Sequence, residues 1–398
     1  PRPVVETSPD PRCTLCVVIP VRDEEERLRD ALEALALQVN HHGHRIDSAC
    51  YEVIVLCNNC SDASVDVARQ FAAAHPDLSL HVLEVTLPAD MAHVGAARRL
   101  LMDEAAARLA SLGKWRGVIA MTDADSCVEP DWAWGILEEV WRGADAVGGR
   151  IFVDPSDQAG LDPMSRSYHL HDVGYRTLVT EVDGLLDPVA WDPLPRHFQH
   201  FGPSLAVTVD AYRKVGGIPP LPWLEDVALY DRLVLHDARI RHSPLVRLRT
   251  SGRQAGRTGF GFAVQLGLWR EMGMHAEPFR VPSSGEVAAL ARSRRHLRRM
   301  WCHRDRHGIE TVAEWLLLDR DWLADLLDDS MTFGSVVQAI TAEQDEYGVW
   351  KDRWPPVEIG AAIRELRNLL PTLRSTPSPR PAQSLEQIEP ITLLSVAD

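Results

Sequence analysis

The sequence predicts an α/β fold in which helices flank a doubly wound, mostly parallel sheet, followed by a helical C-terminal region. From Leu15 onward, short apolar runs alternate with amphipathic stretches, which is typical of βαβ units. Near Val281 this alternation stops, and the remaining patterns have helical spacing. Hydrophobic residues make up 45% of the 398 residues and charged residues 25%, so a sizeable core is expected and global disorder is excluded.

Short apolar runs bounded by turn residues predict the strands. The first two are LCVVIP and YEVIVL, at 15–20 and 51–56. The others are expected at 81–85, 117–121, 146–153, 204–209 and 245–250.

Helices are predicted between these strands and after them. Residues 23–39 carry apolar side chains at helical spacing, Ser61 and Asp62 are helix start signals, and Pro130 stands near another start. Within the α/β part, helices are expected at 23–39, 61–74, 92–112, 130–143, 164–182 and 225–236, with one more beginning near Gly259. Four further helices are expected at 285–303, 309–328, 334–346 and 357–370.

These patterns divide the chain into four segments. We expect an N-terminal extension at 1–14, an α/β domain at 15–280, and a helical C-terminal region at 281–374. The last stretch, 375–398, is rich in Pro, Ser and Glu at first, which predicts a flexible tail.

Charge and hydropathy exclude some classes of function. The formal charge of −15 argues against a general nucleic-acid binder. No apolar run approaches the roughly 18 residues that a membrane span needs, and the first residues lack a signal-peptide profile, so a cytoplasmic location is expected. The basic stretch 292–306 is a candidate for peripheral contact with an anionic membrane; its alternative is packing against the acidic body of the protein.

Seven cysteines include two CxxC pairs, Cys13/Cys16 and Cys57/Cys60. The first pair opens one predicted strand, whereas the second follows the next strand. If these strands are parallel neighbours, the pairs lie about 17 Å apart, too far to share one zinc ion. We therefore expect reduced thiols.

The strongest chemical feature is TDADSC, which follows the apolar strand VIAM and carries Asp123 and Asp125. Two carboxylates at the end of a buried strand are costly unless a divalent cation or another group compensates them. Parallel sheets also bind ligands at the carboxyl ends of their strands. The alternative is an ordinary solvated turn. Neither a GxGxxG after a strand nor a GxxxxGK[ST] occurs, which weighs against dehydrogenases and P-loop NTPases.

TDAD is one of six polar motifs that occur along the chain in this order: IPVRDEE, CNNCSD, GAARR, TDAD, LEDVALYD and TSGR. This ordered set, over roughly residues 16–263, resembles the family 2 glycosyltransferases with a GT-A fold. The resemblance implies a hexosyltransferase-like enzyme of the EC 2.4 class, which uses Mg²⁺ or Mn²⁺ and transfers a sugar with inversion. The donor would be a UDP-, GDP- or dTDP-sugar, and the acceptor a hydroxyl of a glycan, a lipid or a small molecule.

The same resemblance implies roles for individual residues. Asp226 would be the general base, with Glu225 as its orienter or alternate, while Asp125, assisted by Asp123 and His242, would hold the metal. The residues implied in donor binding are Pro20, Arg22, Glu24, Asn58, Asp62, Arg98, Asp123, Arg253 and Arg257.

Most of these positions also have a structural alternative. Asp62 is equally suited to cap a helix, Arg98 to be solvated on an amphipathic helix, and His242 to be an ordinary histidine. The Glu225–Asp226 pair also suits a helix N-terminus by its charge alone. Asn58 and the next residue stand where the family often has Asp, which leaves the nucleotide base open. His169, His171, His197 and His200 are expected in a wall of the acceptor site.

Two other functions remain open at this level. A nucleotidyltransferase on a related fold is one, although no Gly-rich, Lys- or Arg-bearing loop follows the first strand. The other is a non-catalytic sugar-nucleotide sensor or scaffold whose helical region binds a protein. The oligomeric state is left open.

Overall fold

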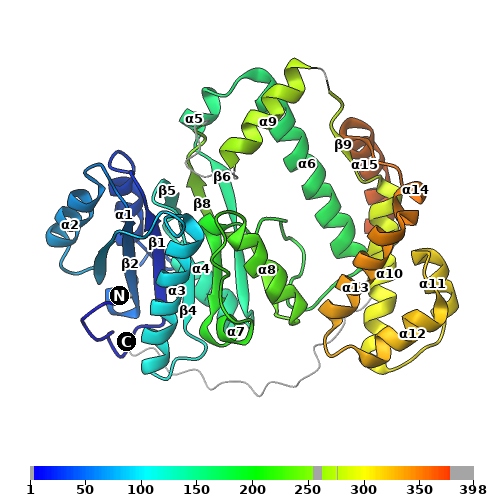
Figure 1. The fold of residues 1–398 in the computed structure, drawn as a ribbon, viewed down its shortest axis with the longest axis horizontal. Coiled ribbons are helices and arrows are strands. Elements are labelled where there is room, and N and C mark those ends of the chain that lie inside the picture. The colour runs from blue at the N-terminus through cyan, green and yellow to red at the C-terminus, as the bar shows by residue number, and fades with distance from the viewer. Residues whose placement is uncertain (1–3, 254–261, 276, 377–398) are drawn as a thin grey trace.

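The computed structural model describes residues 4–253, 262–275 and 277–376. Its centre is one eight-stranded sheet of order β3-β2-β1-β4-β7-β6-β8-β5 (Figure 1). The strands are β1 Leu15–Val21, β2 Tyr51–Asn58, β3 Leu80–Val85, β4 Val118–Met121, β5 Ser126–Val128, β6 Ala146–Val153, β7 Leu205–Thr208 and β8 Ile240–Thr250. Strands β1 to β4 pair in parallel, as do β6 and β8, whereas β7 runs antiparallel to both β4 and β6, and β5 antiparallel to β8. The sheet is thus mixed, and the predicted α/β class is confirmed.

Helices cover both faces of the sheet. The helices of this part of the chain are α1 Leu28–Ala36, α2 Ser64–Ala74, α3 Val94–Ser111, α4 Trp132–Trp141, α5 Pro155–Ala159, α6 Pro163–Leu186, α7 Val209–Lys214, α8 Glu225–Leu235 and α9 Phe262–Met274, with short 3₁₀ turns at Ser48–Cys50 and Gly202–Ser204; six of them cover the sheet. One hydrophobic core places α1, α2 and α4 against the sheet, and a second places α3, α7 and α8 on the other face. Covering a mostly apolar sheet on both sides is the doubly wound arrangement that the sequence predicts.

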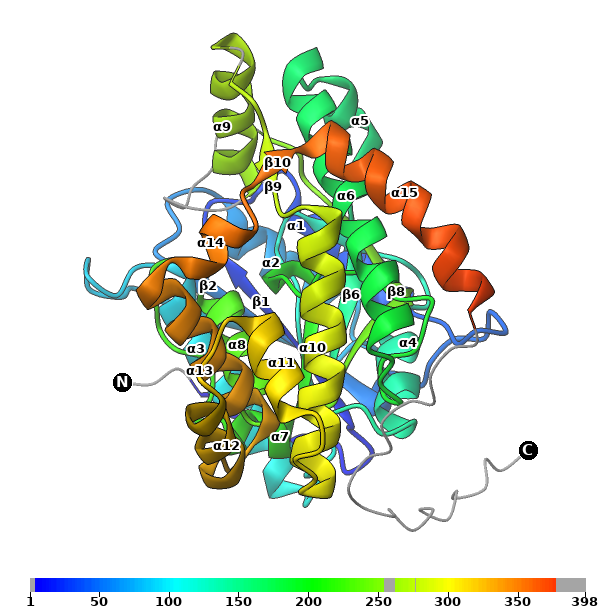
Figure 2. The ribbon, with the colours of Figure 1, turned by 90° about the vertical axis from the view of Figure 1, so that its right-hand side faces the viewer.

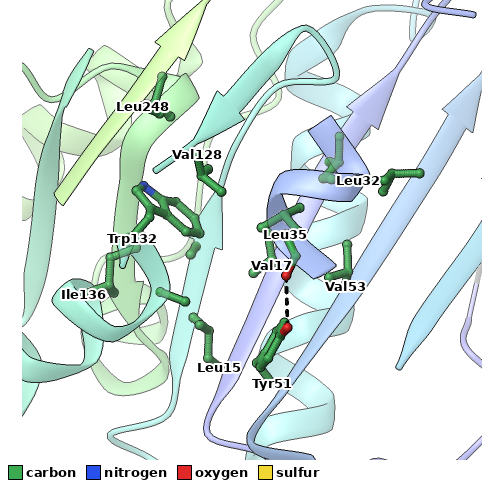
Figure 3. Close-up of a cluster of buried hydrophobic side chains, with 14 of the residues drawn as sticks. Leu15, Val17, Leu32, Leu35, Tyr51, Val53, Val128, Trp132, Ile136 and Leu248 are labelled. Carbon is green, nitrogen blue, oxygen red and sulfur yellow. Dashed lines mark hydrogen bonds between the residues drawn. The ribbon is translucent and has the colours of Figure 1, made fainter. Parts of the chain in front are cut away.

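In the first core, apolar contacts and a hydrogen bond hold α1 against the central strands (Figure 3). Leu32 and Leu35 of α1 lie over Val17 and Val53 of the central strands, and the Tyr51 hydroxyl donates a hydrogen bond of 2.9 Å to the carbonyl of Leu35. Full burial of one such side chain contributes about 1.5–3 kcal/mol to folding stability, so this core fixes the strands against which α1 packs.

The C-terminal part is helical, as predicted. Its elements are β9 Arg280–Val281, α10 Ser284–His303, α11 Ile309–Leu316, α12 Arg320–Asp329, α13 Phe333–Tyr347, α14 Val349–Arg353, β10 Val357–Glu358 and α15 Ile359–Ser375. Figures 1 and 2 show α10 and α15 lying beside α6, which comes from the α/β part. Tyr175 and Val182 of α6 share one core with Val287, Ile363 and Leu366 of these helices.

Three local predictions need correction. Residues 309–328 form two helices instead of one, because Leu317 adopts a left-handed backbone with φ of 59° and the Asp319 carboxylate then caps α12. The first helix begins at Leu28 instead of residue 23, since Asp23 is left-handed with φ of 53°. The short strand β5 was not predicted. Position 259, where a further helix is expected to begin, lies outside the described residues.

The basic stretch 292–306 lies mostly on α10, and its side chains serve different contacts. Arg294 and Arg298 point toward α6 and bind Asp187, while Arg294 also binds Asp183. Leu297 and its neighbouring apolar side chains are buried in the core of the helical region. Of the helices in the described ranges, none combines the length and apolar character needed to span a membrane.

All seven cysteines are free. Cys16 lies near the start of β1, and Cys57 lies near the end of β2, where it pairs with Val21. The two CxxC pairs therefore lie at opposite ends of these strands.

Candidate active site

The carboxyl ends of β1, β2 and β4 meet at one edge of the sheet, because these three strands are parallel neighbours. Glu24, Asn58 and Asp123 follow or end these strands, and the amide of Thr122 donates to the carbonyl of Val18 on β1. The polar groups singled out in the sequence thus share one edge, where parallel sheets bind ligands.

Arg98 joins two of the predicted motifs. Its side chain is only 6% exposed; one terminal nitrogen donates to Asp123 Oδ1 at 2.5 Å and the other to Glu225 Oε1. Because α3 carries Arg98 and α8 begins at Glu225, this buried guanidinium connects the segment that carries Asp123 and Asp125 with the start of α8. The alternative of a solvated Arg98 is excluded.

A second arginine links the other acidic groups. Arg253, which follows β8, binds Glu24 through two nitrogens at 2.9 and 2.6 Å and lies 3.2 Å from Asp125. Burial is the main cause that raises the pKa of Asp125 to about 6; the charge of Asp123 adds to this, and Arg253 opposes it. A nearby cation stabilises the ionised form of a buried carboxyl whose pKa is raised in this way.

Asp226 lies in the first turn of α8, half-buried. Its Oδ2 accepts a hydrogen bond of 2.6 Å from the amide of Gly202, and its Oδ1 accepts one of 2.9 Å from the amide of Val227. The neighbouring Glu225 is buried, and burial raises its pKa, while the charge of Arg98 opposes the rise. The two side chains therefore differ in exposure, since Asp226 is partly exposed and Glu225 is buried.

The predicted nucleotide edge is assembled from loops. Asp62 accepts hydrogen bonds from the amides of Glu25 and Ser64, so it ties the loop after β1 to the start of α2. Asn58 is buried, and its Oδ1 has no hydrogen-bond partner among the described residues. Arg22 is exposed and donates to the carbonyl of Ala92 at 2.8 Å. Pro20 is half-buried within β1, and Arg257 lies outside the described residues.

His242 belongs to a different cluster. Its Nδ1 lies 2.9 Å from Asp192 Oδ2, and its Nε2 lies 3.4 Å from the hydroxyl of Tyr230. The His200 ring stacks on Tyr230 with centroids 3.6 Å apart. Burial lowers the pKa of His197 to about 3 and that of His200 to about 4, so both are neutral at pH 7.

This cluster lines a cavity of about 950 Å³ between the sheet domain and the helical region. Its walls come from α6, α8, α10 and α13 and from the segment 187–200. Among the four histidines expected in an acceptor wall, His197 and His200 line this cavity. His169 and His171 lie nearer the N-terminal end of α6, where Nδ1 of His171 forms a hydrogen bond with the carbonyl of Ser167.

The oxygen donors at the sheet edge fit a hard divalent cation. Asp123 and Asp125 offer carboxylates, and Thr122 Oγ1 is buried without a partner in the described part of the chain. Mg²⁺ and Mn²⁺ bind such oxygens and keep positions for phosphate oxygens, so two protein carboxylates suffice. Within the described residues, Asp123, Asp125 and His242 do not form a ready-made group of three converging ligand atoms.

The sequence analysis missed Gly202, which lies against both Arg98 and Asp226. The only local signal was the Gly-Pro dipeptide, which marks a turn but says nothing of what the turn contacts. The pairing of Glu24 with Arg253 was also missed, because 229 residues separate them.

Comparison with known protein families agrees with this arrangement. The family model described as Glycosyl transferase family 2 matches residues 16–191. This part of the chain is therefore similar to the family 2 glycosyltransferases. The matched part of the chain contains Glu24, Arg98, Asp123 and Asp125, whereas Asp226 lies beyond it.

Several solved structures are similar to this chain. A mannosyltransferase from Pyrobaculum calidifontis, in complex with GDP-Man and Mn²⁺, is 16% identical with a TM-score of 0.43, covering 93% of this chain and 90% of that one. The 1–349 fragment of TarS from S. aureus, in complex with UDP, is 12% identical with a TM-score of 0.43, covering 84% and 92%. Glucosyl-3-phosphoglycerate synthase from Mycobacterium tuberculosis, in complex with Mn²⁺, UDP and phosphoglyceric acid, is 14% identical with a TM-score of 0.38, covering 61% and 72%. Among curated proteins, no significant sequence match is found.

Proposed function

We propose that the protein is a metal-dependent, inverting glycosyltransferase that moves a sugar from a nucleoside diphosphate to an acceptor hydroxyl. The observation that carries this proposal is the double bridge at the sheet edge. Arg98 connects Asp123 with Glu225, and Arg253 connects Glu24 with Asp125. The two bridges meet at the segment that carries Asp123 and Asp125, and Asp226 follows Glu225 directly, so candidate groups for a diphosphate, a cation and a base lie near one another.

In this proposal Asp125, supported by Asp123, holds Mg²⁺ or Mn²⁺. When bound, the cation supplies positive charge that stabilises the leaving nucleoside diphosphate. Arg253 then serves the diphosphate, because its planar fork binds oxyanions in pairs and it is 30% exposed. Asn58, whose oxygen is unpaired within the described chain, is the candidate contact for the base of the nucleotide.

Asp226 acts as the general base of the proposed reaction. The amides of Gly202 and Val227 each bind one of its oxygens, which fixes the plane of the carboxylate. Asp226 lies in the first turn of α8 and is partly exposed, so an acceptor hydroxyl can come within hydrogen-bond distance of its carboxylate. The acceptor hydroxyl would lose its proton to Asp226 as its oxygen forms the new bond to the anomeric carbon, while the bond from that carbon to the diphosphate oxygen breaks and the nucleoside diphosphate leaves.

The first test measures donor binding by calorimetry and thermal shift, with UDP-glucose, GDP-mannose and dTDP-glucose, each with Mn²⁺, with Mg²⁺ and with EDTA. We expect metal-dependent binding of one nucleotide sugar, followed by its slow hydrolysis with water as the acceptor. Binding that is equal with and without EDTA would refute the metal role. No binding or hydrolysis of any donor by folded protein would refute the function.

A further inference from the structure

Gly202 lies where the donor side of the site meets the base. It is buried, and its amide donates the hydrogen bond of 2.6 Å to Asp226 Oδ2. A Cβ atom added to Gly202 would overlap the guanidinium group of Arg98, lying 2.5 Å from its Cζ. Non-bonded carbon atoms need about 3.5–4.0 Å, so only glycine permits this contact.

The register of the sheet explains why Gly202 reaches this position. Leu205 opens β7 and pairs antiparallel with Met121, the last residue of β4. The residues just before β7 therefore run alongside those just after β4, which include Asp123. Gly202 begins the 3₁₀ turn before β7. It therefore lies next to the segment that carries Asp123 and Asp125, although about 80 residues separate the two in sequence.

Arg98 connects Gly202 with two carboxylates. Its flat guanidinium contacts Gly202, while its two terminal nitrogens bind Asp123 on one side and Glu225 on the other. Glu225 precedes Asp226 in the first turn of α8, so a displacement of Arg98 is transmitted to the base by two routes. One route runs through Glu225 and the other through the amide of Gly202.

We propose that Arg98 and Gly202 act together as positioning residues that hold the carboxylate of Asp226 at a fixed position relative to the reacting carbon of the donor. This inference rests on the proposed function, because it takes Asp226 as the base. A displacement of about 1 Å between a base and its reacting atom lowers turnover about 10²-fold. Loss of the contacts that Arg98 makes with Gly202, Asp123 and Glu225 should therefore lower kcat far more than it weakens donor binding.

The test is a double-mutant cycle of Gly202→Ala and Arg98→Lys in the full chain. It measures release of nucleoside diphosphate from UDP-glucose, GDP-mannose and dTDP-glucose with water as acceptor. We expect Gly202→Ala to lower kcat about 10²-fold while the KM for the donor changes less than about 3-fold. Arg98→Lys should give the same split, because a lysine ammonium cannot bind both carboxylates as the guanidinium does. The double variant should be no worse than Arg98→Lys alone, since the added methyl then meets no guanidinium.

Gly174→Ala is the matched control, because a Cβ at Gly174 in α6 meets no atom within 4 Å. It should leave kcat unchanged. A kcat of Gly202→Ala within about 2-fold of the wild type, or losses that multiply in the double variant, would overturn the inference while leaving the proposed function intact. If Gly202→Ala fails to fold, Arg98→Lys decides: an equal fall in donor affinity and turnover refutes the positioning role. Failure of the wild type to release nucleotide from any donor would refute the proposed function itself.

Discussion

Replacing Asp226 with asparagine tests the base assignment with the least change in shape. The side-chain oxygen of the asparagine can still accept the hydrogen bond from the Gly202 amide. Its NH₂ group then faces the Val227 amide, where Oδ1 of the aspartate now accepts a bond of 2.9 Å. Two donors opposed in this way cost about 1–3 kcal/mol of folding stability.

The catalytic loss should be larger than this structural cost. General-base catalysis contributes about 10²–10⁴-fold, which corresponds to roughly 3–5 kcal/mol in the activation free energy. We therefore expect kcat for donor hydrolysis to fall by that factor while the donor dissociation constant changes less than about 3-fold. Turnover would be measured as release of nucleoside diphosphate, and donor binding by calorimetry with Mn²⁺.

Asp231→Asn is the matched control, because Asp231 is an exposed carboxylate on the same helix α8. It should keep turnover and donor binding within about 2-fold of the wild type. Thermal unfolding of both variants separates a loss of fold from a loss of chemistry. Wild-type turnover in a folded Asp226→Asn variant would refute the base assignment.

Three further outcomes follow from the same geometry. Asp125→Asn should abolish the stimulation of donor binding by Mn²⁺, measured by calorimetry with and without EDTA; stimulation that persists would contradict a metal ligand at this position. Arg253→Lys should weaken donor binding about 10-fold or more, since a single ammonium replaces the fork that now binds Glu24; unchanged affinity would place the diphosphate elsewhere. Glu52→Gln should lower the free energy of unfolding by about 3–5 kcal/mol in denaturant titrations, because it leaves Arg108 buried without its charged partner. Burial alone would raise the pKa of Glu52, but hydrogen bonds led by that from Arg108 outweigh it and lower the pKa to about 2. The stabilisation by Glu52 is therefore complete above about pH 4.5 and is lost as the pH falls toward 2; a variant whose unfolding free energy keeps the wild-type slope across this range would count against it.

The sheet and the order of its polar edge are predictable from the sequence because they depend on local signals. Apolar runs such as YEVIVL indicate a buried strand, and the polar residues that follow must lie at its carboxyl end. The contacts within the site are not local. Arg98 reads as part of an amphipathic helix until the fold brings Glu225 to it across 127 residues.

The break at Leu317 shows a second limit. The apolar spacing of residues 309–328 continues across the break, so periodicity alone predicts one helix. The turn depends on a left-handed leucine, which no residue preference signals, and on the capping carboxylate of Asp319. His242 illustrates the same limit at a single residue, because its partners Asp192 and Tyr230 come from segments whose positions the sequence does not specify.

The shared core of α6, α10 and α15 bears on how the chain can be divided experimentally. Helix α6 comes between β6 and β7 in sequence, yet its apolar side chains Tyr175 and Val182 are covered by helices that begin after residue 283. A fragment that ends at residue 280 would keep α6 but expose this surface to water. We expect such a fragment to aggregate on expression although it contains every residue assigned to catalysis. The C-terminal helices thus complete the hydrophobic core of α6, and experiments on their role should replace surface residues of α10 and α15 and leave both helices in the chain.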